Sequence, residues 1–241
     1  MTLQEILNHR RAVRKFDPTK PLDDHRVEDC LRMATLAPTS SNMQLWEAYH
    51  VTDPETLRLL AHACLDQGSA KTAQQMVVFV TRQDRYRDHA RRVLQAGIDD
   101  IVQNSPKDRQ LHRIKLQKLY YDKLMPLQYS RFFGIKGLLN KLLVQTVGLF
   151  RPIVRQVSEG EVRTVLHKSC ALAVQTFMLA MSEQGYDTCP LEGFDSLLVK
   201  RALHLPHHVQ INMIITCGIR LPEGVRGERF RLPFDEMYHK I

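Results

Sequence analysis

Helical periodicity of apolar and polar residues recurs along most of the chain. Between residues 23 and 37, apolar side chains fall at helical spacing on one face: Val27, Cys30, Leu31 and Ala34. A Ser or Thr followed three residues later by Glu forms a capping box, which predicts helix starts at Thr2 and Ser158. The second half of the helix after Ser158 is apolar on nearly all sides, so we expect it in the core or in a subunit interface. Further helices are predicted over residues 53–65, 84–104 and 109–124.

Strand signals are fewer than helix signals. An alternation of apolar and polar residues predicts a strand over 45–52, and segments rich in β-branched residues predict strands over 76–81 and 209–219. The segment 185–195, GYDTCPLEGFD, is predicted to be a glycine-rich connection. Because helices are interleaved with only three or four strands, we expect a small mixed sheet covered by helices, in a single α+β domain over residues 1–241.

The charge of the chain is concentrated in one segment. The formal net charge is +8, and residues 106–157 hold eleven Lys and Arg against two Asp, a net of +9. The rest of the chain therefore carries a net charge of −1. This distribution argues against nucleic-acid binding by the protein as a whole and marks 106–157 as a basic helical insertion.

Composition indicates a protein of the cytoplasm. The N-terminal residues lack the apolar run of a secretory signal, and no stretch of about 18 uncharged apolar residues predicts a spanning helix. Five cysteines without a CxxC pair are interpreted as reduced thiols, with metal binding as the alternative. The histidines in HLPHH, residues 204–208, are interpreted as a polar turn, and we expect no metal site.

Arginines near both ends of the chain are the main candidates for chemistry. Arg10, Arg11 and Arg14 follow the first helix, and Arg229 and Arg231 lie near the other end. Guanidinium groups suit bidentate binding of phosphate, so the two clusters together favour an anion site. The common glycine-rich phosphate loops and the GxSxG motif of serine hydrolases are absent from the sequence.

Two further stretches complete the set of candidate motifs. APTSSNMQLW, residues 37–46, is a polar loop between a helix and a strand. CPLEGFD, residues 189–195, has bends at Pro190 and Gly193 that would leave the amides of Glu192 and Gly193 free to face a ligand. Each motif alone is weak.

Taken together, the motifs resemble the FMN-dependent nitroreductase family. RRAVRKFDPTKPL, APTSSNMQLW, CPLEGFD and RFRLP are similar to four family motifs and occur in family order from residue 10 to 233. The resemblance implies a three-layer helix/sheet/helix fold in a domain-swapped homodimer, with two FMN sites at the interface. The segment 106–157 lies outside it.

The resemblance also implies roles for individual residues in binding FMN. Those expected at the 5′-phosphate are Arg10, Arg11, Ala12, Arg229 and Arg231. Arg14 is expected near N1 and O2 of the ring, where a cation favours the negatively charged reduced form. Those expected from the partner subunit are Pro38, Thr39, Ser40, Ser41 and Asn42. The chain departs from the family at Ala12, often serine, and at Leu45, usually proline.

The remaining expected contacts lie along the edge of the ring system. Gln67 and Lys71 are candidates for the pyrimidine edge, while the amides of Glu192 and Gly193 would face N5 and O4, in the segment that also contains Pro190 and Leu191. No protein acid or base is needed, because the flavin N5 carries the hydride. The implied activity is a ping-pong transfer of electrons from NAD(P)H through FMN to a nitroaromatic, quinone or similar acceptor.

Two alternatives to that activity stay open. One is a specialised flavin enzyme of the same family, such as a dehalogenase or a metabolite dehydrogenase. The other is a flavin-binding protein at a membrane surface.

The basic insertion also has two interpretations. The first is a lid over the active site and partner subunit, whose aromatic side chains would stack on a flat acceptor: Tyr120, Tyr121, Phe132 and Phe133. The second is peripheral membrane contact through residues 130–151, which would give access to lipid-soluble quinones. The sequence predicts an amphipathic helix there, with Lys136, Asn140, Lys141 and Gln145 opposite an apolar side: Ile135, Leu138, Leu139, Leu142, Leu149 and Phe150.

Overall fold

A four-stranded sheet forms the centre of the molecule. A computed structural model describes residues 1–130 and 135–241. The strands are β1 (Trp46–Val51), β2 (Gln75–Thr81), β3 (Asp187–Leu191) and β4 (Gln210–Gly218), in the order β1-β2-β4-β3. All three strand pairings are antiparallel, so the prediction of a mixed sheet was wrong. Within the described residues, the only parallel pairing is the single bridge between Ala12 and Thr188.

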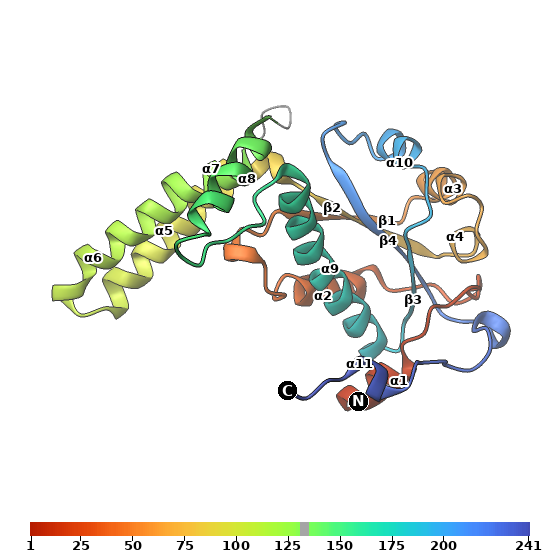
Figure 1. The fold of residues 1–241 in the computed structure, drawn as a ribbon. Helices are drawn as coiled ribbons and strands as arrows, with labels where there is room; N and C mark the ends of the chain where they lie inside the picture. Colours follow the sequence, from red (N-terminus) through yellow and green to blue (C-terminus); the bar gives the residue numbers. More distant parts are fainter. Residues whose placement is uncertain (131–134) are drawn as a thin grey trace.

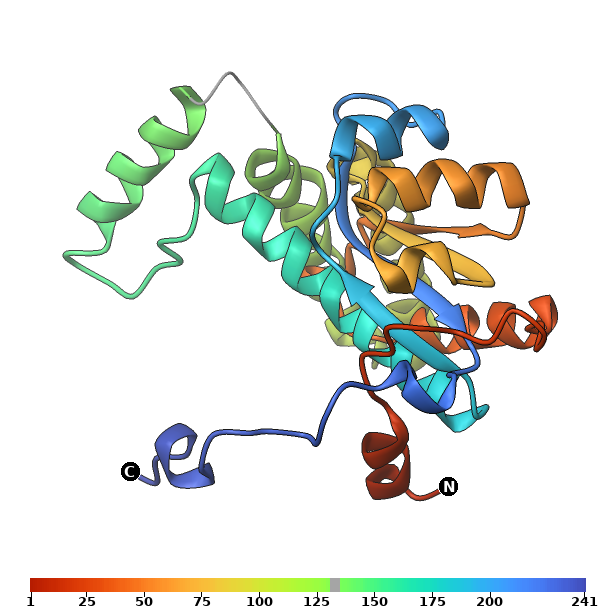
Figure 2. The same ribbon diagram turned by 90° about the vertical axis from the view of Figure 1, so that its right-hand side faces the viewer.

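Helices cover both faces of the sheet, as Figures 1 and 2 show. Successive residues of a strand point to opposite faces, so Val78 and Val80 of β2 face one layer while Val77 and Phe79 face the other. The first layer contains α3 (Pro54–Ala63) and α10 (Ser196–Ala202), and the second contains α2 (Asp24–Ala34) and α9 (Glu159–Glu183). The chain therefore has the expected three-layer α+β architecture.

Strand β3 occupies the segment that was predicted to be an irregular connection. Thr188, Cys189 and Leu191 are buried there, and Pro190 pairs with Ile215 of β4. A proline cannot donate a ladder hydrogen bond, which made the segment look like a turn. Because β3 is an edge strand, the missing donor faces away from the ladder and is tolerated.

The two predicted capping boxes are confirmed. Thr2 caps α1 (Leu3–His9), and Ser158 caps the 25-residue helix α9. Helix α2 buries Val27, Cys30 and Ala34, as its periodicity predicts. All five cysteines are free and buried. The remaining short elements are η1 (Ser40–Asn42), α4 (Gly68–Lys71), η2 (Gln83–Arg85), η4 (Pro222–Gly224) and α11 (Phe234–Met237).

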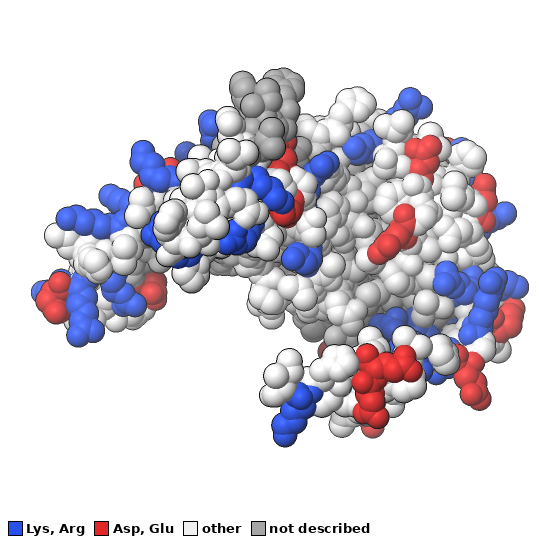
Figure 3. Space-filling view, in the orientation of Figure 1, with Lys and Arg blue, Asp and Glu red and all other residues white. Residues whose placement is uncertain are grey.

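A helical arm projects from the sheet domain. It consists of the antiparallel pair α5 (Tyr86–Asn104) and α6 (Lys107–Lys118), the π-helix η3 (Leu119–Leu124), α7 (Met125–Tyr129) and α8 (Ile135–Val147). Figure 3 shows Lys and Arg side chains distributed over this arm. The predicted stacking residues Phe132 and Phe133, and the side chains of Ile135, Lys136 and Leu138, lie outside the described part of the structure.

Candidate functional site

Six arginines from the two ends of the chain line one cavity. The cavity has a volume of about 280 Å³ and lies where the segment after α1 meets the C-terminal tail. Its lining includes Arg10, Arg11, Ala12, Arg14, Arg226, Arg229 and Arg231. The structure thus brings together all five arginines predicted from the sequence and adds Arg226, which lies outside the matched motifs.

The arginines of this cavity repel one another. Burial lowers the pKa of Arg10, and the guanidinium groups of Arg229 and Arg231 lower it further. Among the ion pairs of the described residues, none includes any of the six arginines, although Glu228 also lines the cavity. A concave site with this charge attracts an anion that carries more than one negative charge.

Backbone carbonyl groups hold the arginines in place. Arg229 Nη2 donates to the carbonyl oxygens of Arg10, at 2.7 Å, and Asn8, at 3.1 Å. Arg11 Nη2 donates to the carbonyl oxygen of Gly227 at 2.9 Å. These carbonyls include ones left without partners at the end of α1, so the tail both closes the cavity and completes the helix end.

A buried ion pair lies directly behind the arginine cavity. Asp187, 4% exposed, accepts from Arg220 Nε at 2.8 Å and from the Arg220 backbone N–H at 2.7 Å. Arg220 Nη2 also donates to the carbonyl oxygen of His9 at 2.8 Å. His9 in turn lies 3.0 Å from Ser182 Oγ through Nδ1. Sequence analysis missed this cluster, because its members are scattered and no motif joins them.

The segment 192–193 has the properties expected of a ligand-facing loop. Gln67 Nε2 donates to the carbonyl oxygens of Gly193, at 2.9 Å, and Cys64, at 3.0 Å, which fixes the backbone. In the described residues, neither the Glu192 nor the Gly193 amide has a hydrogen-bond acceptor. Lys71 is exposed at the end of α4. Gln67, predicted to contact the pyrimidine edge, thus holds the backbone of residues 192–193 in place.

The polar loop 39–44 has a strained backbone conformation. Ser41, Asn42 and Gln44 have φ angles of 52°, 50° and 49°, in the left-handed region that side chains with a Cβ rarely adopt. Gln44 stabilises the turn by donating its backbone N–H to Thr39 Oγ1 at 3.1 Å. Its side-chain Nε2 donates to Asn42 Oδ1 at 3.2 Å.

The helical arm holds the loop from outside. Tyr121 donates its hydroxyl to the Ser41 carbonyl oxygen at 3.0 Å, and the Tyr120 hydroxyl lies 2.7 Å from Ser41 Oγ. Both hydroxyls, predicted to belong to acceptor-stacking rings, are thus hydrogen-bonded to the loop. The departure at Leu45 also has a structural reason, because this side chain is 3% exposed and packs in the core at the base of the arm.

Helix α9 separates the loop from the arginine cavity. Ser169 accepts from the Ser40 backbone N–H at 3.1 Å, while Ser182 donates to the carbonyl oxygen of Ile6 at 2.9 Å. These two serines are thirteen residues apart on α9, so the loop and the end of α1 are about 20 Å apart along the helix. One chain therefore does not bring Thr39–Asn42 to its own arginine cavity.

Comparison with known proteins shows which family has this architecture. A model of the nitroreductase family matches residues 7–219. The chain belongs to the nitroreductase family. It is 24% identical over 236 residues to MhqN of Bacillus subtilis, named as an NAD(P)H nitroreductase, covering 96% of this chain and 95% of MhqN.

Solved structures share the fold of this chain. The ydfN nitroreductase of Bacillus subtilis aligns with a TM-score of 0.73 at 20% identity, covering 99% of this chain and 98% of the other. A nitroreductase of Exiguobacterium sibiricum, solved in complex with FMN, aligns with a TM-score of 0.69 at 18% identity, covering 100% of this chain and 98% of the other. The resemblance stated from the sequence motifs is confirmed.

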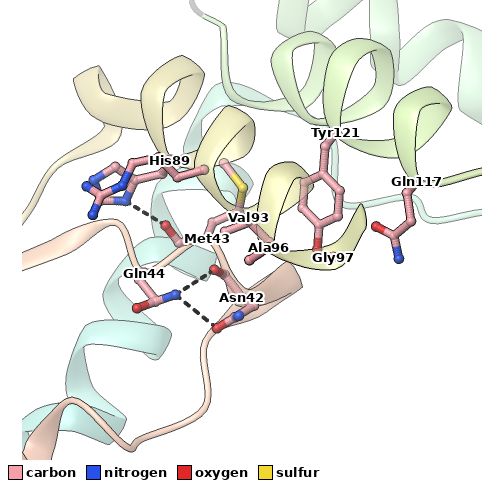
Figure 4. A pocket seen from close by; sticks show the side chains of 10 residues that line it. Asn42, Met43, Gln44, His89, Val93, Ala96, Gly97, Gln117 and Tyr121 are labelled. Carbon is pink, nitrogen blue, oxygen red and sulfur yellow. Dashed lines mark hydrogen bonds between the residues drawn. The ribbon is translucent and has the colours of Figure 1, made fainter. Parts of the chain in front are cut away.

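A further cavity lies between the polar loop and the arm. This cavity, of about 490 Å³, is lined by Asn42, Met43 and Gln44 on one side and by the arm helices α5 and α6 and η3 on the other. Figure 4 shows Tyr121 and Gln117 reaching toward it from the arm. His89 Nδ1 lies 2.8 Å from the Met43 carbonyl oxygen, which fixes the floor.

The histidines of residues 204–208 lie in contact with neighbouring polar groups. His208 lies 3.4 Å from Asp84, and Lys200 donates to the carbonyl oxygen of His207 at 2.8 Å. These contacts make HLPHH part of a polar turn. Across the residues that the structure describes, no three His, Cys, Asp or Glu side chains are grouped to hold a metal ion.

Proposed function

We propose that this member of the nitroreductase family is an FMN-dependent oxidoreductase that takes electrons from NAD(P)H. The arginine cavity carries the proposal, since six guanidinium groups converge there without a carboxylate partner in the described chain. The 5′-phosphate of FMN is a dianion of suitable size and geometry for such a cavity. The FMN complex of the Exiguobacterium protein and the name of MhqN support the cofactor and the electron donor, respectively.

The residues around the cavity fit the rest of the cofactor. Arg10, Arg229 and Arg231 would bind the phosphate, with Arg11 and Ala12 beside it. Ala12 has no hydroxyl, and its backbone is held against β3 by the bridge to Thr188. Arg226, which also lines the cavity, would supply a donor in place of the missing serine hydroxyl.

The pyrimidine edge of the ring would meet donors from this chain. Arg14 would provide a cation that stabilises negative charge on the reduced ring. Gln67 orients the 192–193 backbone through its bond to the Gly193 carbonyl, so that the Glu192 and Gly193 amides would donate to the cofactor. When bound, FMN supplies hydride transfer at N5, and the protein contributes binding, orientation and charge.

The complete site is proposed to need a second copy of the chain. The loop Thr39–Asn42 lies about 20 Å along α9 from the end of α1, so the loop of a partner subunit would serve the cavity of this one. The C-terminal tail supports this arrangement, because its large apolar side chains are exposed: Phe230, Leu232, Phe234, Met237 and Tyr238. A domain-swapped homodimer would bury them.

The expected reaction is ping-pong exchange with a small acceptor. NAD(P)H would reduce the cofactor and leave, and a nitroaromatic or quinone would then take its place. The cavity beside Asn42 and Gln44 is large enough for an aromatic acceptor. A specialised reaction, such as dehalogenation or oxidation of one metabolite, is the second candidate, favoured by the rigid contacts between arm and loop.

The test is spectroscopic. Purified protein is expected to be yellow, to show flavin absorbance, and to be bleached by NADH or NADPH in the absence of oxygen. Steady-state rates with a quinone acceptor should give parallel double-reciprocal lines. Bound flavin that neither nicotinamide reduces would favour the specialised reaction, and a colourless protein that takes up no added FMN would refute the proposal.

A further inference from the structure

Helix α8 turns its leucines outward, into solvent. Leu139, Leu142 and Leu143 are 64%, 67% and 62% exposed. Their spacing of three and four residues places them on one stripe of the helix. A helix packed on a protein core normally directs such a stripe inward, so the orientation of α8 is the reverse of the usual one.

The opposite face of α8 attaches the helix to the rest of the molecule. Val144 is buried, and Gly137 approaches α9 so closely that an added Cβ would lie 2.9 Å from the Glu159 nitrogen. Lys141 Nζ donates to Glu161 at 2.8 Å. Hydrogen bonds from Lys141 and Ser158 hold the pKa of Glu161 at about 2, so this pair stays charged at neutral pH. The outward direction of the leucines is therefore fixed by specific contacts.

The exposed apolar stripe continues past the end of α8. Leu149 and Phe150 are 78% and 85% exposed. Arg155 donates to the carbonyl oxygen of Gly148 at 2.8 Å and to the side chain of Gln145, so its charge sits beside the helix end. Figure 3 shows uncharged surface over α8, with Lys and Arg atoms at its margins and Asp or Glu atoms on the side that meets the sheet domain.

Positive charge predominates in the local sequence around the stripe, while Glu161 at the start of α9 pairs with Lys141 on the attached face of α8. Residues 123–158 contain six Lys and Arg and no Asp or Glu. The preceding part of the arm, residues 108–122, contains four Lys and Arg and two Asp. Positive charge combined with exposed leucine and phenylalanine is the chemistry that binds an anionic lipid surface.

We propose that α8 and the turn after it dock the protein on the surface of an anionic lipid bilayer. The helix would lie in the interface with its leucine stripe among the acyl chains and with Arg151 and Arg155 at the headgroups. No helix among the described residues is long and apolar enough to cross a bilayer, so the contact is with one leaflet. This inference is independent of the cofactor and of the electron acceptor.

A second copy of the chain is a less suitable occupant for this face. If two copies met through the same α8 face, the basic side chains around each stripe would face each other. Anionic headgroups instead neutralise them. The stripe also lies on a projecting helix, which a lipid surface can accept without a complementary groove (Figure 2).

Vesicle sedimentation of the full-length protein tests the proposal. The probes are phosphatidylcholine vesicles with and without phosphatidylglycerol. We expect binding to the anionic vesicles that weakens with added salt, and little binding to the neutral ones. L139Q/L142Q/L143Q should weaken binding at least about tenfold, since three apolar side chains no longer enter the lipid. The matched control, L111Q/L116Q, changes leucines of α6 that are 66% and 53% exposed and should bind as the unchanged protein does.

Three outcomes would overturn the proposal. One is absence of sedimentation with anionic vesicles, and another is equal sedimentation of the two leucine variants. The third is a fall in solution mass, measured by light scattering, for L139Q/L142Q/L143Q alone, which would make α8 a subunit contact. The substituted side chains are all exposed, so unchanged circular dichroism should accompany the variants and exclude misfolding as the cause.

Discussion

The arginine cavity lies near the C-terminal end of α9 and the polar loop lies beside the middle of this helix, and the two are made rigid in different ways. The cavity concentrates like charges, which neighbouring carbonyl groups hold in position. The loop concentrates left-handed residues, which hydroxyl and amide hydrogen bonds hold in position. An anion that binds in the cavity would reduce the repulsion among the arginines. The loop needs no ligand, because its own hydrogen bonds already hold its backbone. Substitutions should therefore affect ligand affinity at the cavity and local order at the loop.

The largest loss of stability is expected when the contact between Arg220 and the buried Asp187 is removed. Arg220→Met leaves the carboxylate of Asp187, 4% exposed, without its partner. Removing one member of a fully buried pair costs about 3–5 kcal/mol. The Arg220 side chain is 28% exposed and its backbone N–H still donates to Asp187 in the variant, so the free energy of unfolding measured in urea should fall by somewhat less than that amount. FMN affinity should fall as well, because the carbonyl of His9 next to Arg10 loses its donor.

A matched control separates this effect from the loss of any ion pair. Arg58 forms a two-pronged contact with Glu55 on an exposed helix surface. Arg58→Met should leave the free energy of unfolding almost unchanged, because solvent screens this exposed pair. Similar losses in both variants would show that the Asp187 pair has no special role.

An intermediate effect is expected for the cavity itself. Arg10→Ala removes a charge-assisted contact worth about 1.5–3 kcal/mol, so the Kd for FMN should rise roughly 10- to 100-fold in fluorescence titrations. Thermal stability without FMN should not fall, because the repulsion from Arg229 and Arg231 is relieved. Arg91→Ala on α5, at an exposed position, serves as the control. An unchanged Kd for R10A would place the phosphate elsewhere.

The smallest effect is expected at the loop. Tyr121→Phe removes the hydrogen bond to the Ser41 carbonyl and should lower stability by about 0.5–1.5 kcal/mol. Hydrogen exchange at Ser41–Gln44 should quicken, whereas the Kd for FMN should change much less than in R10A. Tyr238→Phe, in the exposed tail, is the control. Exchange that stays slow in Y121F would mean that the remaining contacts of the loop, those of Gln44, Tyr120 and Ser169, hold it without Tyr121.

Local sequence signals predicted the fold well and the supporting contacts poorly. Capping boxes at Thr2 and Ser158 and the β-branched runs of β2 and β4 depend on neighbouring residues, so they are visible in the chain. Strand β3 was missed because Pro190 imitates a turn. The Asp187–Arg220 pair joins residues 33 positions apart, and no local pattern encodes it.

The same distinction between local signals and distant contacts applies to the candidate site and to α8. The predicted arginines were identifiable by type and by motif, and the structure gathers them in one cavity. The outward orientation of α8 could not be predicted, because an amphipathic pattern gives the faces of a helix but not which face meets the core. The contacts of Lys141 and Gly137 with the start of α9 decide that orientation.

The contacts between chain ends have a consequence for biosynthesis. Arg229 donates to the carbonyl of Arg10, and Arg11 donates to that of Gly227, across more than two hundred residues. The cavity therefore cannot close before Arg229 has been synthesised and released. The sheet needs less of the chain, because β4 ends at Gly218. A chain cut just before Arg229 would keep all four strands but lack the tail side of the cavity, so proteolysis of the tail would open an anion site without removing the sheet.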